Sequence, residues 1–255
     1  FDALMGEATC TDAVPYDRQP YLFDAPALPT AGRHIVYLDT WHRTITHVEA
    51  PDLAEIAVGV ETSGRTQAAW QVRVLDTAEV GANATCESSD EAWNALVAPS
   101  TGLLSTGTFE DPAILDPCEL PPSGGYRGLE NQLYRVEIHA PGKPGAGATF
   151  KFSRENASVV VPVEAWVNDK ELRLGSLGRD VVLGFKTGDW VEIVDDALEF
   201  LRQPGQMRRI TVEHGTRHIT FDDALPASLN TDPAGRHLRV VRWDQANKVR
   251  ALDAN

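Results

Sequence analysis

The chain has 255 residues, 42% of them hydrophobic, which is enough for one large domain or two smaller ones with buried cores. Its 37 acidic and 23 basic residues give a net charge of -14, which argues against a nucleic-acid partner. Apolar stretches such as Val159 to Val163 fall far short of the roughly 20 residues that cross a bilayer, so no membrane span is expected. No initiator Met and no basic-then-apolar leader is present, so we expect an internal segment of a longer protein whose signal peptide is absent or removed.

The three cysteines, Cys10, Cys86 and Cys118, are far apart and form no Cys-x-x-Cys pair. This spacing does not predict a structural zinc site. Two alternatives stay open for their redox state. Either one disulfide forms, for example Cys86 with Cys118, or all three remain thiols.

Residues 1–30 are rich in proline, which predicts an extended N-terminal segment. Residues 31–98 are expected to form a first β-rich lobe with a short helix. Within it, RHIVYLDTW at 33–41 is typical of a strand buried largely on both sides. In AAWQVRVL at 68–75 we expect Trp70, Val72 and Val74 on the buried face, alternating with exposed Gln71 and Arg73.

A short helix is predicted by Ser88 and Glu91, which match a capping box, followed by apolar residues at helical spacing up to Pro99. Residues 99–125 are dominated by Pro, Ser, Thr, Gly and Asp, and we expect an irregular connection there.

A second β-rich lobe is expected over residues 126–255. LYRVEIH at 133–139 and TFKFS at 149–153 predict a hairpin with a long tip. Further strands are predicted at 189–194, at 208–213 and 217–221 around Gly215, and at 237–243, with one helical turn capped by Asp195 or Asp196. With eight to ten strands and one or two short helices, the expected class is mainly β, with antiparallel sandwich-like or barrel-like lobes.

No pattern of residues predicts catalysis, a cofactor or a metal site. Gly142-Lys143 is followed by proline rather than the Ser or Thr of a phosphate-binding loop. His42 and His47 lie five residues apart on a strand and so face opposite ways, which favours surface histidines over metal ligands. The adjacent pairs Asp195-Asp196 and Asp222-Asp223 are more typical of turn and capping groups than of calcium or glycosidase sites.

The densest polar block is GGYRGLENQLYRVEIH at 124–139, with SREN at 153–156 near the end of the expected partner strand. Its candidate residues are Tyr126, Arg127, Glu130, Asn131, Gln132, Arg154, Glu155 and Asn156. They form either a recognition site or a polar network in which Arg127 or Arg154 pairs with Glu130 or Glu155 to fix the turn. Polar groups at strand ends often satisfy orphaned backbone groups, which favours the network.

Several blocks, including PPSGGYRGLENQLYRVEIH at 121–139, FKFSREN at 150–156 and GDWVEI at 188–193, resemble a bacterial family of unknown function. Members of that family often lie in gene clusters for phage-tail-like contractile injection systems, and they extend beyond both ends of this chain. They typically have Trp in place of Phe152 and Asp in place of Glu155. The resemblance carries over no catalytic residue.

The resemblance therefore implies a non-enzymatic structural or adhesive β module of a phage-tail-like particle. Its partners would be other particle subunits, with a surface glycan as a further ligand. Its location would be the bacterial cytoplasm during assembly or the outside of the cell on a released particle. The alternative is a carbohydrate-binding or glycan-cleaving protein that uses some of the six Trp residues and the many carboxylates.

Overall fold

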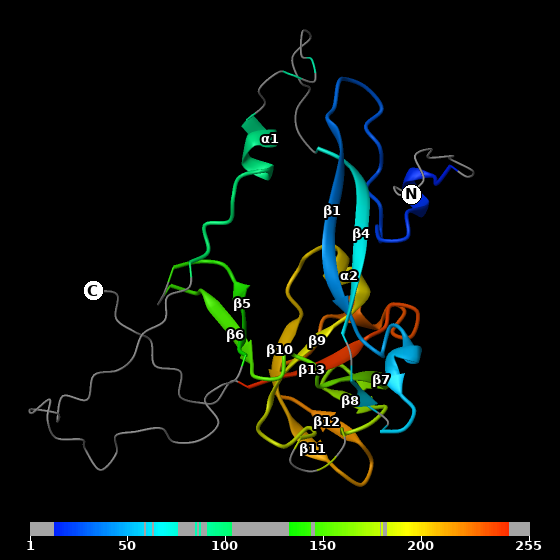
Figure 1. The fold of residues 1–255 in the computed structure, drawn as a ribbon, viewed down its shortest axis with the longest axis vertical. Helices are drawn as coiled ribbons and strands as arrows, with labels where there is room; N and C mark the ends of the chain where they lie inside the picture. The colour runs from blue at the N-terminus through cyan, green and yellow to red at the C-terminus, as the bar shows by residue number, and fades with distance from the viewer. Residues whose placement is uncertain are drawn as a thin grey trace, which may run out of the picture.

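Figure 1 shows a computed structural model, which describes residues 13–58, 60–62, 64–75, 85, 87, 91–103, 133–143, 146–178, 180 and 183–244. The expected mainly β, antiparallel architecture with barrel-like strands and two short α-helices is confirmed. The three cysteines, Ser88, residues 1–12 and residues 104–125 of the expected connection lie outside the described residues.

Seven strands form one antiparallel sheet in the order β10-β9-β13-β7-β8-β12-β11. They are β7 (Val160–Asn168), β8 (Glu171–Leu174), β9 (Trp190–Val194), β10 (Gln206–Arg209), β11 (Thr211–Glu213), β12 (His218–Thr220) and β13 (Arg239–Trp243). Only Ile210 separates β10 from β11, so the two ends of the strand order are joined by continuous chain. The sheet therefore curls into a nearly closed barrel.

The hydrophobic core lies inside this barrel. Alternate residues of its strands point inward because successive side chains of a strand face opposite ways. They are joined by Phe185, Leu225, Leu229 and Leu238 from the connections. In β9, Val191 and Ile193 are fully buried, and Ile210 is buried at the junction of β10 and β11.

Two hairpins leave the barrel (Figure 1). One pairs β1 (Val36–Ile45) with β4 (Arg65–Val74), and its base carries the short pair β2 (Ala54–Glu55) and β3 (Val60–Glu61). The other pairs β5 (Arg135–Ala140) with β6 (Thr149–Ser153), as predicted. The helix α1 (Glu91–Leu96) lies between the two hairpins along the chain, at its predicted place.

The helix α2 (Asp196–Phe200) follows β9 directly and fixes the first hairpin to the barrel. As predicted, Asp195 caps it by accepting a hydrogen bond from the Leu198 backbone N–H at 2.9 Å. Its last residue, Phe200, packs against the rings of Tyr21, Phe23 and Trp41. Short 3-10 helices occupy Tyr16–Arg18, Pro51–Leu53 and Ala227–Asn230, and no helix among the described residues is long and apolar enough to cross a membrane.

The burial of the first hairpin corrects two predictions. β1 is not buried on both sides, because its even-numbered residues are exposed and Val36 and Leu38 each retain 63% of their accessible surface. In β4 the buried phase is also the reverse of the prediction, since Ala69 and Gln71 are buried. Gln71 is fully buried because its amide donates hydrogen bonds to the Phe200 carbonyl at 3.1 Å and to the Tyr21 carbonyl.

The predicted strands at 189–194, 217–221 and 237–243 are confirmed as β9, β12 and β13. The single strand predicted at 208–213 is instead divided at Ile210 into β10, which pairs with β9, and β11, which pairs with β12. The Gly215 hairpin pairs Val212 with Ile219, and both are buried. The patterns predicted neither strand of the β7–β8 hairpin, and the described residues contain thirteen strands rather than eight to ten.

Candidate functional site: a cleft between two hairpins

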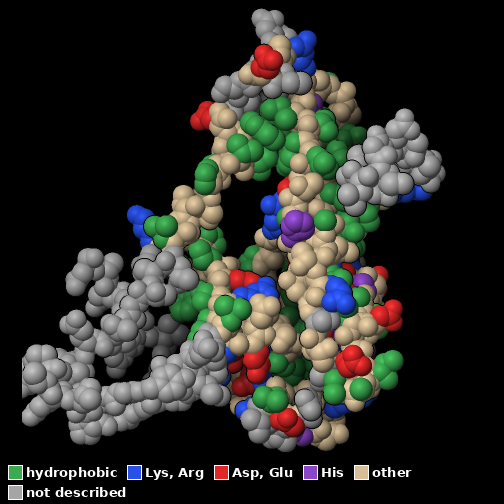
Figure 2. All heavy atoms as spheres, viewed as in Figure 1, with side chains coloured by type: hydrophobic (Ala, Val, Ile, Leu, Met, Phe, Trp, Pro, Cys, Tyr) green, Lys and Arg blue, Asp and Glu red, His purple; other side chains and the backbone are tan. Residues whose placement is uncertain are grey.

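A cleft of about 890 Å3 lies where the two hairpins meet the barrel. Its walls come from β1 and β5, and its floor comes from α2 and from residues of β6, β9 and β13. Figure 2 shows acidic and basic side chains gathered below an opening between β1 and the segment that carries α1. Two clusters of charged side chains line the cleft.

The first, here called the Arg239 cluster, joins β1, α2 and β13. The Arg43 guanidinium lies 2.6 Å from the Glu49 carboxylate and 2.8 Å from the Glu199 carboxylate. The Arg239 guanidinium lies 2.8 Å from Asp196 and also contacts Glu199. Two guanidinium groups therefore face three carboxylates in a site where Arg239 is only 4% exposed.

The electrostatics of this cluster keep its members charged. Burial raises the pKa of the Glu49 carboxyl, but Arg239, Arg43 and hydrogen bonds from Thr46 outweigh it and hold the pKa below 4.5. Burial lowers the pKa of Arg239, but Glu199, Glu49 and Asp196 outweigh it and raise the pKa above its ordinary value.

One oxygen from each of Glu49, Asp196 and Glu199 falls within 4.8 Å of the others, a spacing that suits a metal ion. Here the guanidinium groups of Arg43 and Arg239 lie against these oxygens and supply the positive charge. The donor set therefore fits an ion-pair network better than a metal centre.

The second, here called the Lys151 cluster, joins the β5–β6 hairpin to β9 and β13. Lys151 Nζ lies 2.5 Å from Glu192 Oε2 and 3.1 Å from Glu137 Oε2. The Trp243 indole N–H donates to the same Glu192 oxygen at 3.0 Å, and Lys151 Nζ lies 4.5 Å from the centre of a Trp243 ring. Burial raises the pKa of Glu137, but Lys151 and Arg135 outweigh it and lower the pKa below its ordinary value.

The Lys151 cluster gives the β5–β6 hairpin an unusual orientation. Its polar side chains face the barrel, where the His139 imidazole also lies 3.0 Å from the Gly205 carbonyl oxygen. Its apolar side chains face outward, with Tyr134, Ile138 and Phe150 all exposed. The hairpin is therefore held by charge pairing and hydrogen bonds on its inner face.

Among aromatic side chains that line the cleft, Trp41 is half-buried and Trp243 is almost completely buried. The Arg202 guanidinium lies 4.8 Å from the centre of a Trp41 ring. The six tryptophans therefore do not form a row of open stacking platforms on the described surface of the cleft.

Three of the candidate polar residues, Arg154, Glu155 and Asn156, directly follow β6 and contact β13, the residue after it and β5. The Arg154 backbone N–H donates to the Asp244 carboxylate at 2.7 Å, and its exposed guanidinium lies 3.5 Å from the same side chain. Glu155 lies 2.5 Å from Arg242. Asn156 has φ of 55°, and its carbonyl accepts a hydrogen bond from Arg135 at 3.2 Å.

These contacts join the turn after β6 to β13, and Asn156 also lines the cleft. The other candidates, Tyr126, Arg127, Glu130, Asn131 and Gln132, lie outside the described residues. His42 is exposed on β1, whereas His47 is half-buried and its ring lies 3.2 Å from Glu61.

Apart from Asp196, the charged residues of both clusters belong to no sequence motif, because most of the ion pairs join residues far apart along the chain. The sequence nevertheless contains a signal for these buried charges. Glu192 interrupts the otherwise apolar strand β9, and Lys151 lies between Phe150 and Phe152 in β6. A buried charge has to be paired, so such an interruption indicates a network even where its partners are distant.

A model of a family of unknown function, DUF6519, matches residues 27–99 and 82–254, and the chain therefore belongs to this family. No curated protein and no solved structure matches the chain.

Proposed function

We propose that this chain is a non-enzymatic structural or adhesive β module of a phage-tail-like particle, in which it contacts neighbouring protein subunits. The non-enzymatic, structural role is supported by one observation, the pairing of the cleft carboxylates with cationic side chains. Glu49, Glu137 and Glu192 each face a guanidinium or ammonium group at 3.1 Å or less. Carboxylates held in this way serve to fix the hairpins to the barrel.

The pKa directions support the same proposal. A general acid needs a pKa raised toward neutrality, but the pKa values of Glu49 and Glu137 are lowered. Asp195 does have a raised pKa, owing chiefly to burial, but its carboxylate is engaged in capping α2. The phage-tail-like particle is proposed because the sequence resembles a family whose members often lie in gene clusters for such particles.

The test is to tag the protein at its native locus and to sediment particles from lysates and culture supernatants. We expect the protein to co-sediment with sheath or baseplate subunits, and to stay in the light fractions of a strain that lacks the sheath subunit. A protein that remains in the light fractions of the unaltered strain would remove the particle from the proposal.

A second candidate function is carbohydrate binding, favoured by one observation: half-buried Trp41 lines a cleft that also holds carboxylates. If this cleft binds glycans, a Trp41→Ala variant should lose binding on a glycan array, and the half-buried Trp70, which does not line the cleft, provides the matched control as Trp70→Ala. Equal binding by both variants would exclude the cleft.

A further inference from the structure

The strand β1 has one paired edge and one open edge among the described residues. The Leu75 N–H donates to the Ile35 carbonyl at 2.8 Å, which fixes the hydrogen-bonding phase of the β1–β4 ladder. Since bonding and non-bonding pairs alternate in an antiparallel ladder, the odd-numbered residues of β1 bond to β4. Its even-numbered residues then direct their N–H and C=O groups away from β4.

The outer edge of β4, on the opposite side of the hairpin, agrees with this hydrogen-bonding phase. Unlike the edge of β1, it is covered by a side chain. The Val72 N–H donates to Gln19 Oε1 at 2.6 Å, and Gln19 Nε2 donates to the Val72 carbonyl at 2.9 Å. A side-chain amide thus covers the outer edge of β4. The outward groups of β1 have no such partner among the described residues.

One face of the β1–β4 hairpin, which borders the open edge, lacks acidic residues, lysine and arginine. This face contains Val36, Leu38, Thr40, His42, Thr44, Thr66, Ala68, Trp70, Val72 and Val74. The charged residues of both strands, such as Asp39 and Arg43, lie on the other face or at its end. A chain with a net charge of -14 thus keeps this surface neutral.

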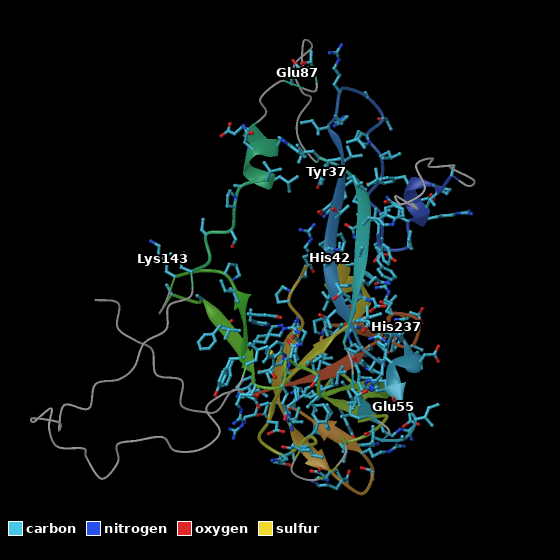
Figure 3. All side chains as sticks on the ribbon, in the orientation of Figure 1. Tyr37, His42, Glu55, Glu87, Lys143 and His237 are labelled. Carbon is cyan, nitrogen blue, oxygen red and sulfur yellow. The ribbon has the colours of Figure 1, made fainter. Side chains whose placement is uncertain are left out.

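The cleft beside β1 is also balanced in charge. Its lining contains five carboxylates, from Glu49, Glu61, Glu137, Glu192 and Glu199, and five cationic groups, from Arg43, Arg135, Lys151, Arg202 and Arg239. Figure 3 labels Tyr37 and His42 along β1, which borders the opening on one side, with β5 across from it. The lower part of the open edge, at His42 and Thr44, lines this cleft.

We infer that the open edge of β1 accepts an extended, uncharged segment of a partner protein as an added strand. An array of N–H and C=O groups repeated every second residue matches the backbone of another strand, and a neutral surround admits a segment without charged side chains. A second copy is disfavoured because each copy carries a charge of -14. The inference deepens the proposed function and rests on it only in taking a protein as the partner.

The experiment uses the full chain and a capped, uncharged peptide of about eight alternating threonine and valine residues with terminal serines and asparagines for solubility. NMR amide exchange is measured with and without the peptide. We expect added protection at the outward amides of Leu38, Thr40 and His42. A peptide with the same side chains but N-methylated backbone amides should give none, because it has no donors for the edge.

A protein variant tests the same edge from the other side. Thr40→Pro removes only an outward N–H and should weaken peptide binding at least about tenfold, whereas Thr40→Val should bind as the wild type does. Continued protection of the Asp39 and Trp41 amides would show that the proline variant keeps the hairpin. If the proline variant loses the hairpin, the inference is tested on the wild type alone, by comparing its binding of the unmodified and the N-methylated peptide.

The inference is overturned if the wild type binds both peptides equally, if neither protects the outward amides, or if these amides are already protected in a dimer of the free chain. If the protein does not co-sediment with particles but still binds the peptide, the proposed particle is wrong and the strand site stands. The reverse result would remove only the strand site.

Discussion

Arg239 on β13 donates a hydrogen bond to Asp196, the first residue of α2, across 2.8 Å. Because Asp196 follows the Asp195 cap directly, this bond ties the start of the helix to the barrel wall. The same guanidinium contacts Glu199 one turn later and lies 3.6 Å from Glu49, so a single side chain joins three separate segments.

Replacement of Arg239 by alanine should therefore be severe. It leaves Glu49 and Glu199 with Arg43, and Asp196 with the His237 ring at 2.6 Å, and breaking a buried ion pair from one side costs about 3 to 5 kcal/mol. Urea denaturation followed by fluorescence measures the free energy of unfolding. Arg239→Met should lose a similar amount, since the loss comes from charge rather than volume.

The matched control is Arg154→Ala. The Arg154 guanidinium is exposed and lies 3.5 Å from Asp244, so its loss should cost less than about 1 kcal/mol. If Arg239→Met unfolds at the same urea concentration as the wild type, the Arg239 cluster does not stabilise the fold.

A second prediction concerns Gln71, which is fully buried in β4. Gln71→Leu keeps the approximate size of the side chain but removes the hydrogen bonds to the carbonyls of Phe200 and Tyr21. Leaving buried acceptors unpaired costs about 1 to 3 kcal/mol, and we expect a loss of this size in thermal or urea unfolding.

The exposed Gln203 offers the control, because Gln203→Leu should change stability by no more than about 0.5 kcal/mol. A Gln71→Leu protein more stable than the wild type would show that the position simply prefers an apolar side chain.

Gln71 also shows where pattern reasoning on β4 fails. Alternation of Trp70, Val72 and Val74 correctly indicates a strand, but it assigns the buried face by hydrophobicity alone. The packing partner of the opposite face includes the backbone carbonyl of Phe200, which requires an amide donor. Local sequence contains no information on a partner 129 residues away.

The strands of the barrel also differ in how well the sequence predicts them. Regular strands such as β9 and β13 follow from their apolar residues and flanking turns. β7 does not follow in this way, because it contains Pro162 and proline normally disfavours an interior strand. In the structure Pro162 is exposed beside a register shift, and its carbonyl still joins the sheet by accepting the Gly175 N–H at 2.9 Å.

A third prediction concerns Gly205, whose backbone N–H donates to Glu192 Oε1 at 2.9 Å. A Cβ at this position would lie 2.6 Å from the Glu192 Cγ and 2.8 Å from the Ile193 carbonyl oxygen. Gly205→Ala should therefore displace Glu192 from Lys151 and cost about 1 to 3 kcal/mol in urea unfolding.

Gly215 serves as the comparison, since a Cβ there meets no atom within 4 Å. Gly215→Ala should stay within about 0.5 kcal/mol of the wild type. Equal losses in the two variants would indicate that the close approach at Gly205 is relieved by small movements.

The fourth prediction is the response of stability to acid. The pKa of Glu49 is lowered in the folded state, so its ionised form stabilises the fold above its ordinary pKa of 4.5. This contribution is lost as the pH falls through the lower, folded-state pKa. Glu137 acts in the same direction. Asp195 acts in the opposite direction because burial raises its pKa, so its protonation on acidification favours the folded state.

Two carboxyls with lowered pKa values against one with a raised value predict a net loss of stability on acidification below about pH 4.5. Glu49→Gln should be less stable than the wild type near neutral pH, and the difference should shrink as the pH falls below 4.5 and the wild-type carboxyl is protonated. Urea unfolding at a series of pH values measures both curves. Glu164→Gln, at an exposed carboxylate, should follow the wild-type curve. A constant difference between Glu49→Gln and the wild type would mean that the charge of Glu49 does not contribute to stability, because a loss of packing alone is independent of pH.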